Sequence, residues 1–339
     1  MGGQDWAIVV GIQDYPGLAN KLEGVRGDAE DFKAWLLKDA AIPARQILSE
    51  ISPAKPAKTP RAARPPLAVI DRLFEKIVGR VLKLQGGLAA DTKLGRRLYI
   101  YLGGHGFEPD GAEPALLAAD AAEVSMKHIA GRLYAEYFRK AACFSEVVLI
   151  MDCCRIVTSS FPLTTVPLKR LINPGAPARW FYAYATLTAK VAREGGNGAS
   201  SRGLFTSAIL AGLKGGAAIN GQITDRSLKQ FVESEMRKKG LDPDEEQIPE
   251  LKLDDVGGLV LHEIDVHRYN VTLSIPKKFV GGAYNVVGRQ TTSVASGKAA
   301  PKELTLKLEN GKYAIWLDDD LATTMKVEGK DIALEVPEP

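Results

Sequence analysis

The stretch LYIYLGGHG, residues 98–106, decides the fold, and VVLIMDCCR, residues 147–155, has the same form. Each begins with a continuous apolar run and then changes to glycines or to chemically reactive side chains. Such runs are typical of strands buried on both faces, as in a parallel sheet covered by helices. Parallel sheets carry their chemistry at the carboxyl ends of the strands, so the residues after each run are the first candidates for a functional site.

The first two-thirds of the chain continues this alternation of apolar strands and helical patterns. Further strands are expected at residues 6–12 and 180–185, the second reading WFYAYA. Helical spacing of apolar residues predicts helices over residues 28–37, 126–142, 203–213 and 227–238. Strands that alternate with helices indicate an α/β fold in which helices cover both faces of a mostly parallel sheet.

From about Asp265 the pattern changes to short alternating strands. Apolar and polar residues alternate over residues 271–275, 304–308 and 313–317, and two more short strands follow between 325 and 336. Asn310-Gly311 predicts a hairpin between two of these strands. The second part is therefore a small antiparallel β domain that resembles a sandwich, and it shows no catalytic cluster. We predict two domains, residues 1–264 and residues 265–339.

Composition limits the classes of function. The 339 residues fit two domains, and 44 basic against 41 acidic side chains give a net charge of only +3. This balance gives little support for binding nucleic acid or a membrane surface, although the basic, proline-rich stretch at residues 52–66 leaves a nucleic-acid contact open. Three cysteines argue against a disulfide framework, and the apolar run at residues 6–12 is too short to span a membrane. We expect a soluble, cytoplasmic protein.

His105 and Cys154 are the residues most suited to chemistry. Each follows one of the two apolar runs, so in a parallel sheet they would lie side by side at one edge. A free thiol is mostly protonated at neutral pH, and a nearby imidazole shifts it toward the reactive thiolate. The glycines around His105 would allow close approach of another chain and leave backbone N–H groups that could stabilise an oxyanion.

The spacing of these residues supports a family resemblance. His105 precedes Cys154 by 49 residues, close to the separation of about 50 in caspases, and Arg155 also fits their pattern. The chain resembles the caspase-like cysteine peptidases, and within them the bacterial metacaspase-like branch. Further matching stretches are AIVVGIQDY at residues 7–15, Asp28-Ala29, Gly203–Thr206 and Gln247–Pro249. The resemblance covers about residues 5–262.

The resemblance implies a catalytic machinery built on the same residues. Cys154 would be the nucleophile and His105 the general base and acid, while the backbone N–H groups of Gly106 and Cys154 would form the oxyanion hole. Cys153 stands one residue before the nucleophile and would point to the opposite side of an extended chain, so we interpret it as a buried structural thiol. An exchange of the two cysteine roles stays open.

The resemblance also implies a substrate-binding site for basic residues. Asp28 and Asp152 would line the first specificity pocket, with Gly103 nearby. Two carboxylates favour Arg or Lys in the substrate because charge-assisted hydrogen bonds pair them with a cation. A caspase that cleaves after Asp would need arginines there, and Arg26 and Arg155 keep that alternative open.

No cofactor is expected. Calcium dependence is common in metacaspase-like enzymes, but the acids after His105 do not fit a calcium loop, and zinc-ligand spacing is absent. These acids are Glu108, Asp110, Glu113 and Asp120. The long segment after Cys154 is where such proenzymes are often cut during activation. Candidate self-cleavage points are Lys169, Arg170, Arg179 and Arg193.

The sequence thus predicts a cysteine endopeptidase that cleaves a protein substrate after Arg or Lys. The resemblance suggests a role in bacterial antiphage defence or regulated cell death, with a gasdermin-like or other defence protein as the partner. One alternative is a catalytically inactive scaffold whose β domain binds partners. Another is a small-molecule-binding α/β domain, which ranks lowest because no glycine-rich phosphate loop follows a strand. The natural substrate, the activating signal and the oligomeric state are left open.

Overall fold

The structure is a computed structural model of the full chain. It describes residues 4–18, 22–85, 93–109, 113–158, 162–169, 171, 175–187, 194–195, 201–238, 247–255, 258–264, 268–288, 293–300, 302–309, 311–328 and 330–337. The chain divides into two compact units, residues 1–217 with 223–262, and residues 218–222 with 263–339.

The first unit is built on a six-stranded sheet. Its strands are β1 (Trp6–Gly11), β2 (Ile47–Ile51), β3 (Gly95–Gly103), β7 (Phe144–Asp152), β9 (Arg179–Tyr184) and β13 (Glu250–Leu253). They lie in the order β13-β9-β7-β3-β1-β2, and all neighbours are parallel except β13, which runs antiparallel to β9. The predicted α/β class with a mostly parallel sheet is confirmed.

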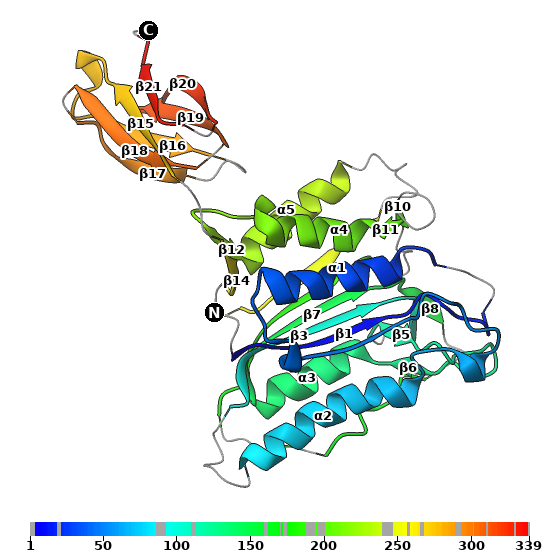
Figure 1. The fold of residues 1–339 in the computed structure, drawn as a ribbon. Coiled ribbons are helices and arrows are strands. Elements are labelled where there is room, and N and C mark those ends of the chain that lie inside the picture. The colour runs from blue at the N-terminus through cyan, green and yellow to red at the C-terminus, as the bar shows by residue number, and fades with distance from the viewer. Residues whose placement is uncertain are drawn as a thin grey trace. The chain divides into compact units, whose positions relative to one another are not determined.

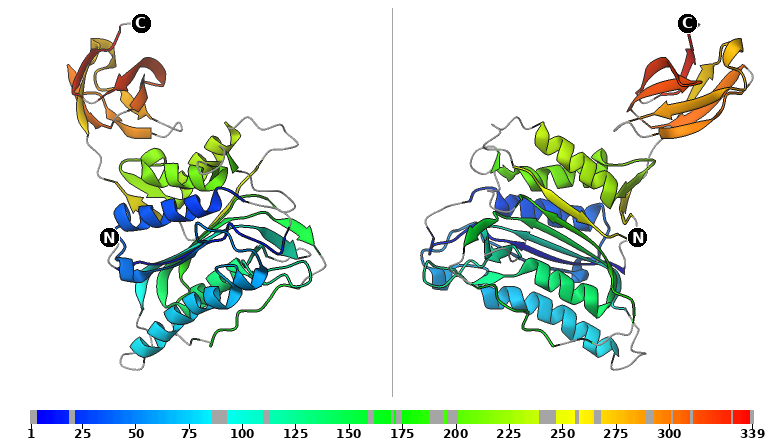
Figure 2. Two further views of the ribbon diagram at one scale, coloured as in Figure 1. Left: turned by 45° about the vertical axis from the view of Figure 1, so that its right-hand side comes forward. Right: turned by 180° about the vertical axis from the view of Figure 1, so that it is seen from behind.

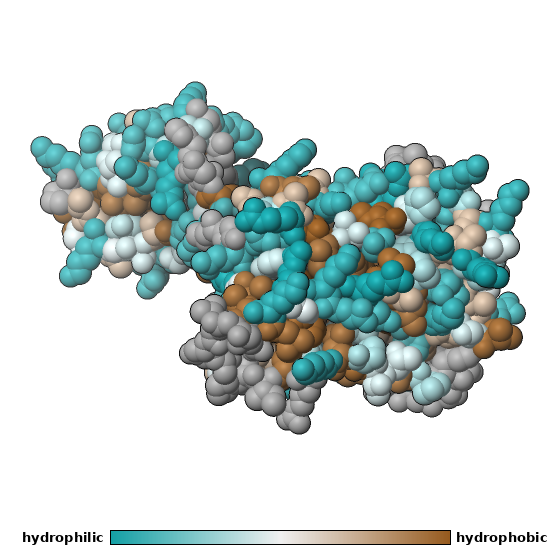
Figure 3. All heavy atoms as spheres, turned by 60° about the horizontal axis from the view of Figure 1, so that its bottom comes forward, coloured by the Kyte–Doolittle hydropathy of each residue, from teal (hydrophilic) through white to brown (hydrophobic). Residues whose placement is uncertain are grey.

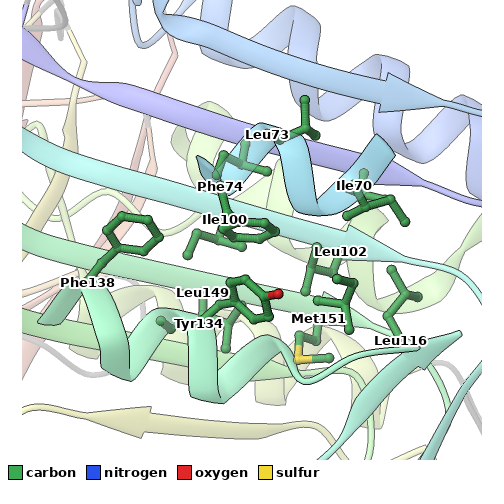
Figure 4. Packing of buried hydrophobic residues seen from close by; sticks show 14 of the residues in the cluster. Ile70, Leu73, Phe74, Ile100, Leu102, Leu116, Tyr134, Phe138, Leu149 and Met151 are labelled. Atoms are coloured by element: carbon green, nitrogen blue, oxygen red, sulfur yellow. The ribbon is translucent and has the colours of Figure 1, made fainter. Parts of the chain in front are cut away.

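Helices cover both faces of this sheet. The helices α1 (Val25–Lys38), α4 (Leu204–Ala211) and α5 (Asp225–Arg237) lie on one side, and α2 (Leu67–Gln85) and α3 (Gly131–Ala141) on the other (Figures 1 and 2). The alternation along β3 explains both layers. Tyr101 stacks on Phe32 of α1 with ring centroids 4.8 Å apart, whereas Ile100 and Leu102 point into the core between the sheet and α2 and α3 (Figure 4).

A second, smaller sheet lies beyond the carboxyl ends of β3 and β7. It has the order β6-β5-β4-β8, with β4 (Gly106–Pro109), β5 (Ala115–Leu117), β6 (His128–Ile129) and β8 (Ile156–Thr158). The predicted helix over residues 126–142 is therefore wrong at its start, because α3 begins only at Gly131. His128 pairs in β6 instead, and its Nε2 accepts the Thr164 N–H at 3.0 Å. Pairing with β5 overrides the helical spacing of these residues.

The remaining elements of the first part of the chain are short. They are the 3-10 helices Ala44–Gln46 and Pro60–Ala62, β10 (Glu194–Gly195), β11 (Arg202–Gly203), the π-helical segment Gly212–Gly216, β12 (Gln222–Thr224) and β14 (Val260–Glu263).

On the side of α2 and α3, hydrophilic side chains surround separate hydrophobic areas (Figure 3). Among the helices that the structure describes, none is long and apolar enough to cross a membrane.

The second unit consists of two small sheets around one apolar core. The sheets have the orders β18-β15-β21 and β17-β16-β19-β20. Their strands are β15 (Tyr269–Ser274), β16 (Ala283–Val287), β17 (Ser293–Lys298), β18 (Glu303–Leu308), β19 (Gly311–Leu317), β20 (Asp320–Val327) and β21 (Ile332–Glu335), and Lys277–Phe279 forms a 3-10 turn. Pairing is antiparallel except between β15 and β21. Leu273 and Leu306 from one sheet and Ile315 from the other belong to the shared core, as expected for a sandwich.

The predicted hairpin at Asn310-Gly311 is wrong. The strands on either side, β18 and β19, lie in different sheets, so this connection passes from one sheet to the other. The alternation of apolar and polar residues shows which side chains of a strand face the core. Because both sheets face the same core, this alternation cannot show to which sheet a strand belongs. The tight hairpin joins β19 to β20, where Asp318 and Asp319 have φ values of 47° and 68° as a primed turn requires.

Candidate active site

β3 and β7 end at the same level of the sheet. Their register pairs Gly103 with Asp152, and the Gly104 N–H donates a hydrogen bond to the Asp152 carbonyl oxygen at 3.1 Å. His105 and Cys154 each follow two residues after this pair. The prediction that both residues leave one edge of the sheet from adjacent strands is confirmed.

The loop that carries His105 packs directly against the chain at Cys154. A Cβ atom on Gly106 would lie 2.7 Å from the Cys153 Sγ and 2.7 Å from the Cys154 carbonyl oxygen, so a larger residue does not fit. The two segments pair again after His105 and Cys154, since β4 and β8 run parallel side by side. Because β3 pairs with β7 before the two loops and β4 pairs with β8 after them, the distance between the loops is fixed.

The three cysteines are free thiols that differ in exposure. Cys154 is partly exposed, whereas Cys153 is 2% exposed and Cys143 is fully buried. Burial raises the pKa of the Cys143 thiol to about 12 and raises the pKa of Cys153 as well. Both therefore remain protonated at neutral pH, and Cys154 is the cysteine that a substrate can reach.

Two buried aspartates lie near this edge, and we call them the aspartate pair. Asp28, in the first turn of α1, is 2% exposed, and Asp152 is 8% exposed. The Gly203 N–H donates to Asp28 Oδ2 at 2.8 Å, and a Cβ atom on Gly203 would lie 2.5 Å from Asp152 Oδ2. Thr206 donates its N–H at 3.2 Å and its hydroxyl at 2.6 Å to Asp152 Oδ2. Residues distant in sequence thus bring both carboxylates together.

The aspartate pair is costly to ionise. Burial, followed by the charge of Asp152, raises the pKa of Asp28 to about 8, although the Gly203 N–H opposes the shift. Burial also raises the pKa of Asp152 to about 6. A cation placed between the carboxylates would favour their ionised forms, because opposite charges attract strongly where water is excluded.

A third carboxylate, Glu194, belongs to the same cluster and was missed in the sequence. It accepts the Glu23 N–H at 2.9 Å and the Gly24 N–H at 2.8 Å, directly before α1 begins. Its charge also raises the pKa of both members of the aspartate pair. No motif surrounds Glu194, so the sequence offers no signal for it.

Arg155, the residue after Cys154, belongs to a buried ion-pair network. Its Nε donates to Glu108 at 2.8 Å, and the side chains of both residues are about 5% exposed. Its Nη1 donates to Glu250 and, at 3.3 Å, to the Thr186 carbonyl oxygen. The guanidinium also lies 5.2 Å from the Tyr184 ring centroid. Arg155 is thus engaged by carboxylates of the protein itself.

Other arginines near the aspartate pair are also in ion pairs. Arg26 pairs with Glu30 at 3.0 Å on the exposed side of α1. The Arg202 Nε lies 4.0 Å from Asp28 Oδ1 but donates to Asp31 Oδ2 at 2.8 Å. The two arginines that would support cleavage after Asp, Arg26 and Arg155, are therefore both bound to glutamates.

Some predicted site residues have other contacts. Gly103 is buried, and its carbonyl oxygen accepts the Ile12 N–H at 2.9 Å, so its contact with substrate stays a prediction. Among the predicted self-cleavage points, Lys169 is exposed, whereas Arg179 is the first residue of β9 in the central sheet. Arg170 and Arg193 lie outside the described residues.

The acids considered for calcium are mostly in ion pairs with basic side chains. Glu108 binds Arg155, Glu113 binds Arg132, and Asp120 lies 2.7 Å from the Lys127 Nζ. Asp110 lies outside the described residues. Within the described ranges, no three His, Cys, Asp or Glu side chains form a group that could hold a metal ion. Activity without calcium stays a prediction.

A mostly parallel sheet with a histidine and a partly exposed cysteine after adjacent strand ends is the arrangement expected of the caspase-like cysteine peptidases. The caspase domain profile matches residues 4–256 of this chain. The chain therefore belongs to the caspase domain family.

Two individual proteins show further similarity. A protein from a Desulfuromonadales bacterium, named "Probable protease", is 27% identical over 266 residues. The match covers 73% of this chain and 31% of that protein, so the chain spans less than a third of this curated relative. The crystal structure of caspase-1 from Spodoptera frugiperda has a TM-score of 0.47 and 12% identity, covering 77% of this chain and 93% of that chain.

Proposed function

We propose that this peptidase hydrolyses peptide bonds after Arg or Lys through a dyad of Cys154 and His105. The observation that supports the proposal best is the register of β3 and β7, which ends both strands together two residues before His105 and Cys154. Cys154 is also the cysteine with an accessible side chain. A nucleophile and a base at one sheet edge are the arrangement that acyl transfer needs.

The reaction follows from these groups. His105 takes the proton of the Cys154 thiol, and the sulfur attacks the carbonyl carbon of the substrate to form a tetrahedral intermediate. When this intermediate collapses, the C–N bond breaks, His105 gives the proton to the leaving amine, and a thioester remains on Cys154. Water, deprotonated by His105, then attacks the thioester and releases the carboxylic acid and the free thiol. The backbone N–H groups of Gly106 and Cys154 would stabilise the oxyanion in both steps.

The aspartate pair supports a preference for a basic residue before the scissile bond. A guanidinium or ammonium group would neutralise two carboxylates that burial and neighbouring negative charges make costly to ionise. Arg26 and Arg155 are held in ion pairs with glutamates, which weakens the alternative of cleavage after Asp. Glu194 adds a further negative charge to the cluster.

The proposal includes a biological setting that rests on the family resemblance. A peptidase of this kind would act in the cytoplasm of a bacterium, in antiphage defence or regulated cell death. Its substrate would be a protein that cleavage activates, such as a gasdermin-like pore former. No cofactor is part of the proposal.

A panel of fluorogenic peptides that differ only in the residue before the scissile bond tests the proposal. Wild-type protein should release the fluorophore from Arg and Lys peptides and much more slowly from Asp and Leu peptides. Cys154→Ala should remove this activity, while the matched variant Cys153→Ala should retain most of it. The reverse result would move the nucleophile by one residue, and no hydrolysis of any peptide would favour the inactive scaffold.

A further inference from the structure

Tyr15 lies in the segment that follows β1, and its side chain contacts the loop that carries His105. Its hydroxyl oxygen accepts the His105 backbone N–H at 2.9 Å, across 90 residues of sequence. Its ring packs on the imidazole, with centroids 4.8 Å apart and planes inclined by 51°. We propose that Tyr15 is a positioning residue for His105, which it holds by one hydrogen bond to the backbone and one ring contact. This inference rests on the proposed role of His105.

The hydrogen bonds around Tyr15 close a ring that includes His105. The Tyr15 hydroxyl donates to the Leu117 carbonyl oxygen at 3.2 Å, and the Leu117 N–H donates to the His105 carbonyl oxygen at 2.8 Å. Both backbone polar groups of His105 are therefore bound to fixed elements. Leu117 ends β5, which pairs with β4 and β6 in the small sheet. The histidine is thus held between β1 and the small sheet.

Gly104 shows how closely Tyr15 approaches this loop. Gly104 has a φ of 149°, a conformation that favours glycine, and a Cβ atom there would lie 2.3 Å from the Tyr15 Oη. The same Cβ would lie 2.9 Å from the Ile12 carbonyl oxygen. The tyrosine hydroxyl therefore occupies the space that any other side chain at position 104 would need.

The surroundings of Tyr15 indicate positioning rather than proton transfer. The residue is 5% exposed, and burial raises the pKa of its phenol well above the usual value, with smaller contributions from Cys153 and Cys154. The phenol therefore stays neutral and can donate to Leu117 while it accepts from His105. Removing its oxygen would leave the partly buried His105 N–H without this acceptor, which is unfavourable and would let the imidazole shift.

The test compares Tyr15→Phe with Tyr134→Phe in the full-length protein. Tyr134 is a matched control because it is also buried and donates one hydrogen bond, to Asp71 at 2.7 Å, from α3. Tyr15→Phe should lower kcat for an Arg peptide by about 10- to 100-fold with little change in KM, because the base is misplaced and the binding groups are not. Its pH profile of kcat/KM should also shift, whereas Tyr134→Phe should leave both quantities unchanged.

Wild-type kcat and an unshifted pH profile in folded Tyr15→Phe protein would overturn the inference. A second measurement does not depend on peptidase activity, so it tests this inference even if the proposed function is wrong. The imidazole of His105 can be titrated by NMR in ¹⁵N-histidine-labelled protein without substrate. Tyr15→Phe should change the pKa of His105 and leave that of His128 unchanged, and equal His105 titrations in both proteins would also overturn it. If Tyr15→Phe does not fold, hydrogen exchange of the backbone amides in the wild-type protein tests the inference instead. The His105 N–H should be protected, and exchange at the rate of an open loop would contradict the inference.

Discussion

The buried charged residues just before and just after Cys154 in the sequence have opposite kinds of neighbours. Before it, Asp152 lies with Asp28, and burial raises the pKa of both carboxyl groups. After it, Arg155 lies within hydrogen-bond distance of Glu108 and Glu250, and opposite charges are matched. Only two residues separate Asp152 from Arg155, yet Asp152 lies beside another carboxyl group and Arg155 lies beside carboxylates of opposite charge.

This difference separates a binding role from a structural one. Buried opposite charges that satisfy each other hold the fold together, and breaking them leaves a charge that cannot be solvated. Buried like charges weaken the fold unless a ligand of opposite charge completes them. On this basis, changes at the aspartate pair should alter substrate binding, and changes at Arg155 should alter stability.

The largest expected effect is on substrate turnover. Asp152→Asn keeps an oxygen for the Thr206 donors and removes the negative charge, so kcat/KM for an Arg peptide should fall by about 1000-fold, in line with the loss of one partner from a buried charge pair. Steady-state hydrolysis measures this value. The slow hydrolysis of a Leu peptide is the control and should change much less. An equal loss for both peptides would place Asp152 in the general machinery instead.

The matched change at Arg155 should affect folding. Arg155→Met removes the cation and leaves Glu108 buried, so the free energy of unfolding should fall by about 3 kcal/mol. Urea denaturation provides the measurement. In protein that remains folded, the ratio of Arg to Leu peptide hydrolysis should match the wild type. A lost preference for Arg would mean that Arg155 contributes to specificity, and the comparison would fail.

The pH dependence of KM is a further test of the role of the aspartate pair in substrate binding. Below about pH 8 Asp28 is mostly protonated in the free protein, and a basic substrate must displace that proton to pair with the carboxylate. KM for an Arg peptide should therefore fall as pH rises toward 8, by up to about tenfold per pH unit, and then level off. KM for a Leu peptide should stay flat, and a parallel fall in both would assign the titration to another group.

The last expected effect is the pH dependence of the free energy of unfolding without substrate. Since the pKa of Asp28 is raised to about 8 in the folded state, the native protein holds a proton that the unfolded chain has lost, and stability falls as pH rises toward 8. Asp28→Asn removes this dependence, so the variant should gain about 1.4 kcal/mol per pH unit relative to wild type as the pH rises from 5 to 8. Thermal unfolding at both values tests this. A constant difference would show that Asp28 ionises freely in the fold.

Much of the fold could be predicted because its strands are continuous apolar runs. Residues 98–102 and 147–151 lie in β3 and β7, and the change of pattern near residue 265 falls close to the junction of the two units. The helix start near residue 126 and the hairpin at Asn310-Gly311 were wrong. Both errors concern segments whose pairing partners lie elsewhere in the chain, which local spacing cannot identify.

The site could be predicted only as far as strand ends and the family resemblance reach. His105 and Cys154 follow apolar runs, so their meeting is implied by a parallel sheet. Glu194 and Tyr15 act through contacts with chain segments 90 or more residues away. Neither stands in a pattern that local physical chemistry explains, so only the folded arrangement reveals what they contact.

The order of synthesis gives the aspartate pair a further consequence. Asp28 leaves the ribosome early, Asp152 much later, and the segment with Glu194, Gly203 and Thr206 later still. A nascent chain that has emerged only as far as β9 already contains both aspartates but lacks Gly203 and Thr206, which donate the hydrogen bonds to them. The hydrogen bonds that hold the two carboxylates can therefore form only after the segment that follows β9 has been synthesised.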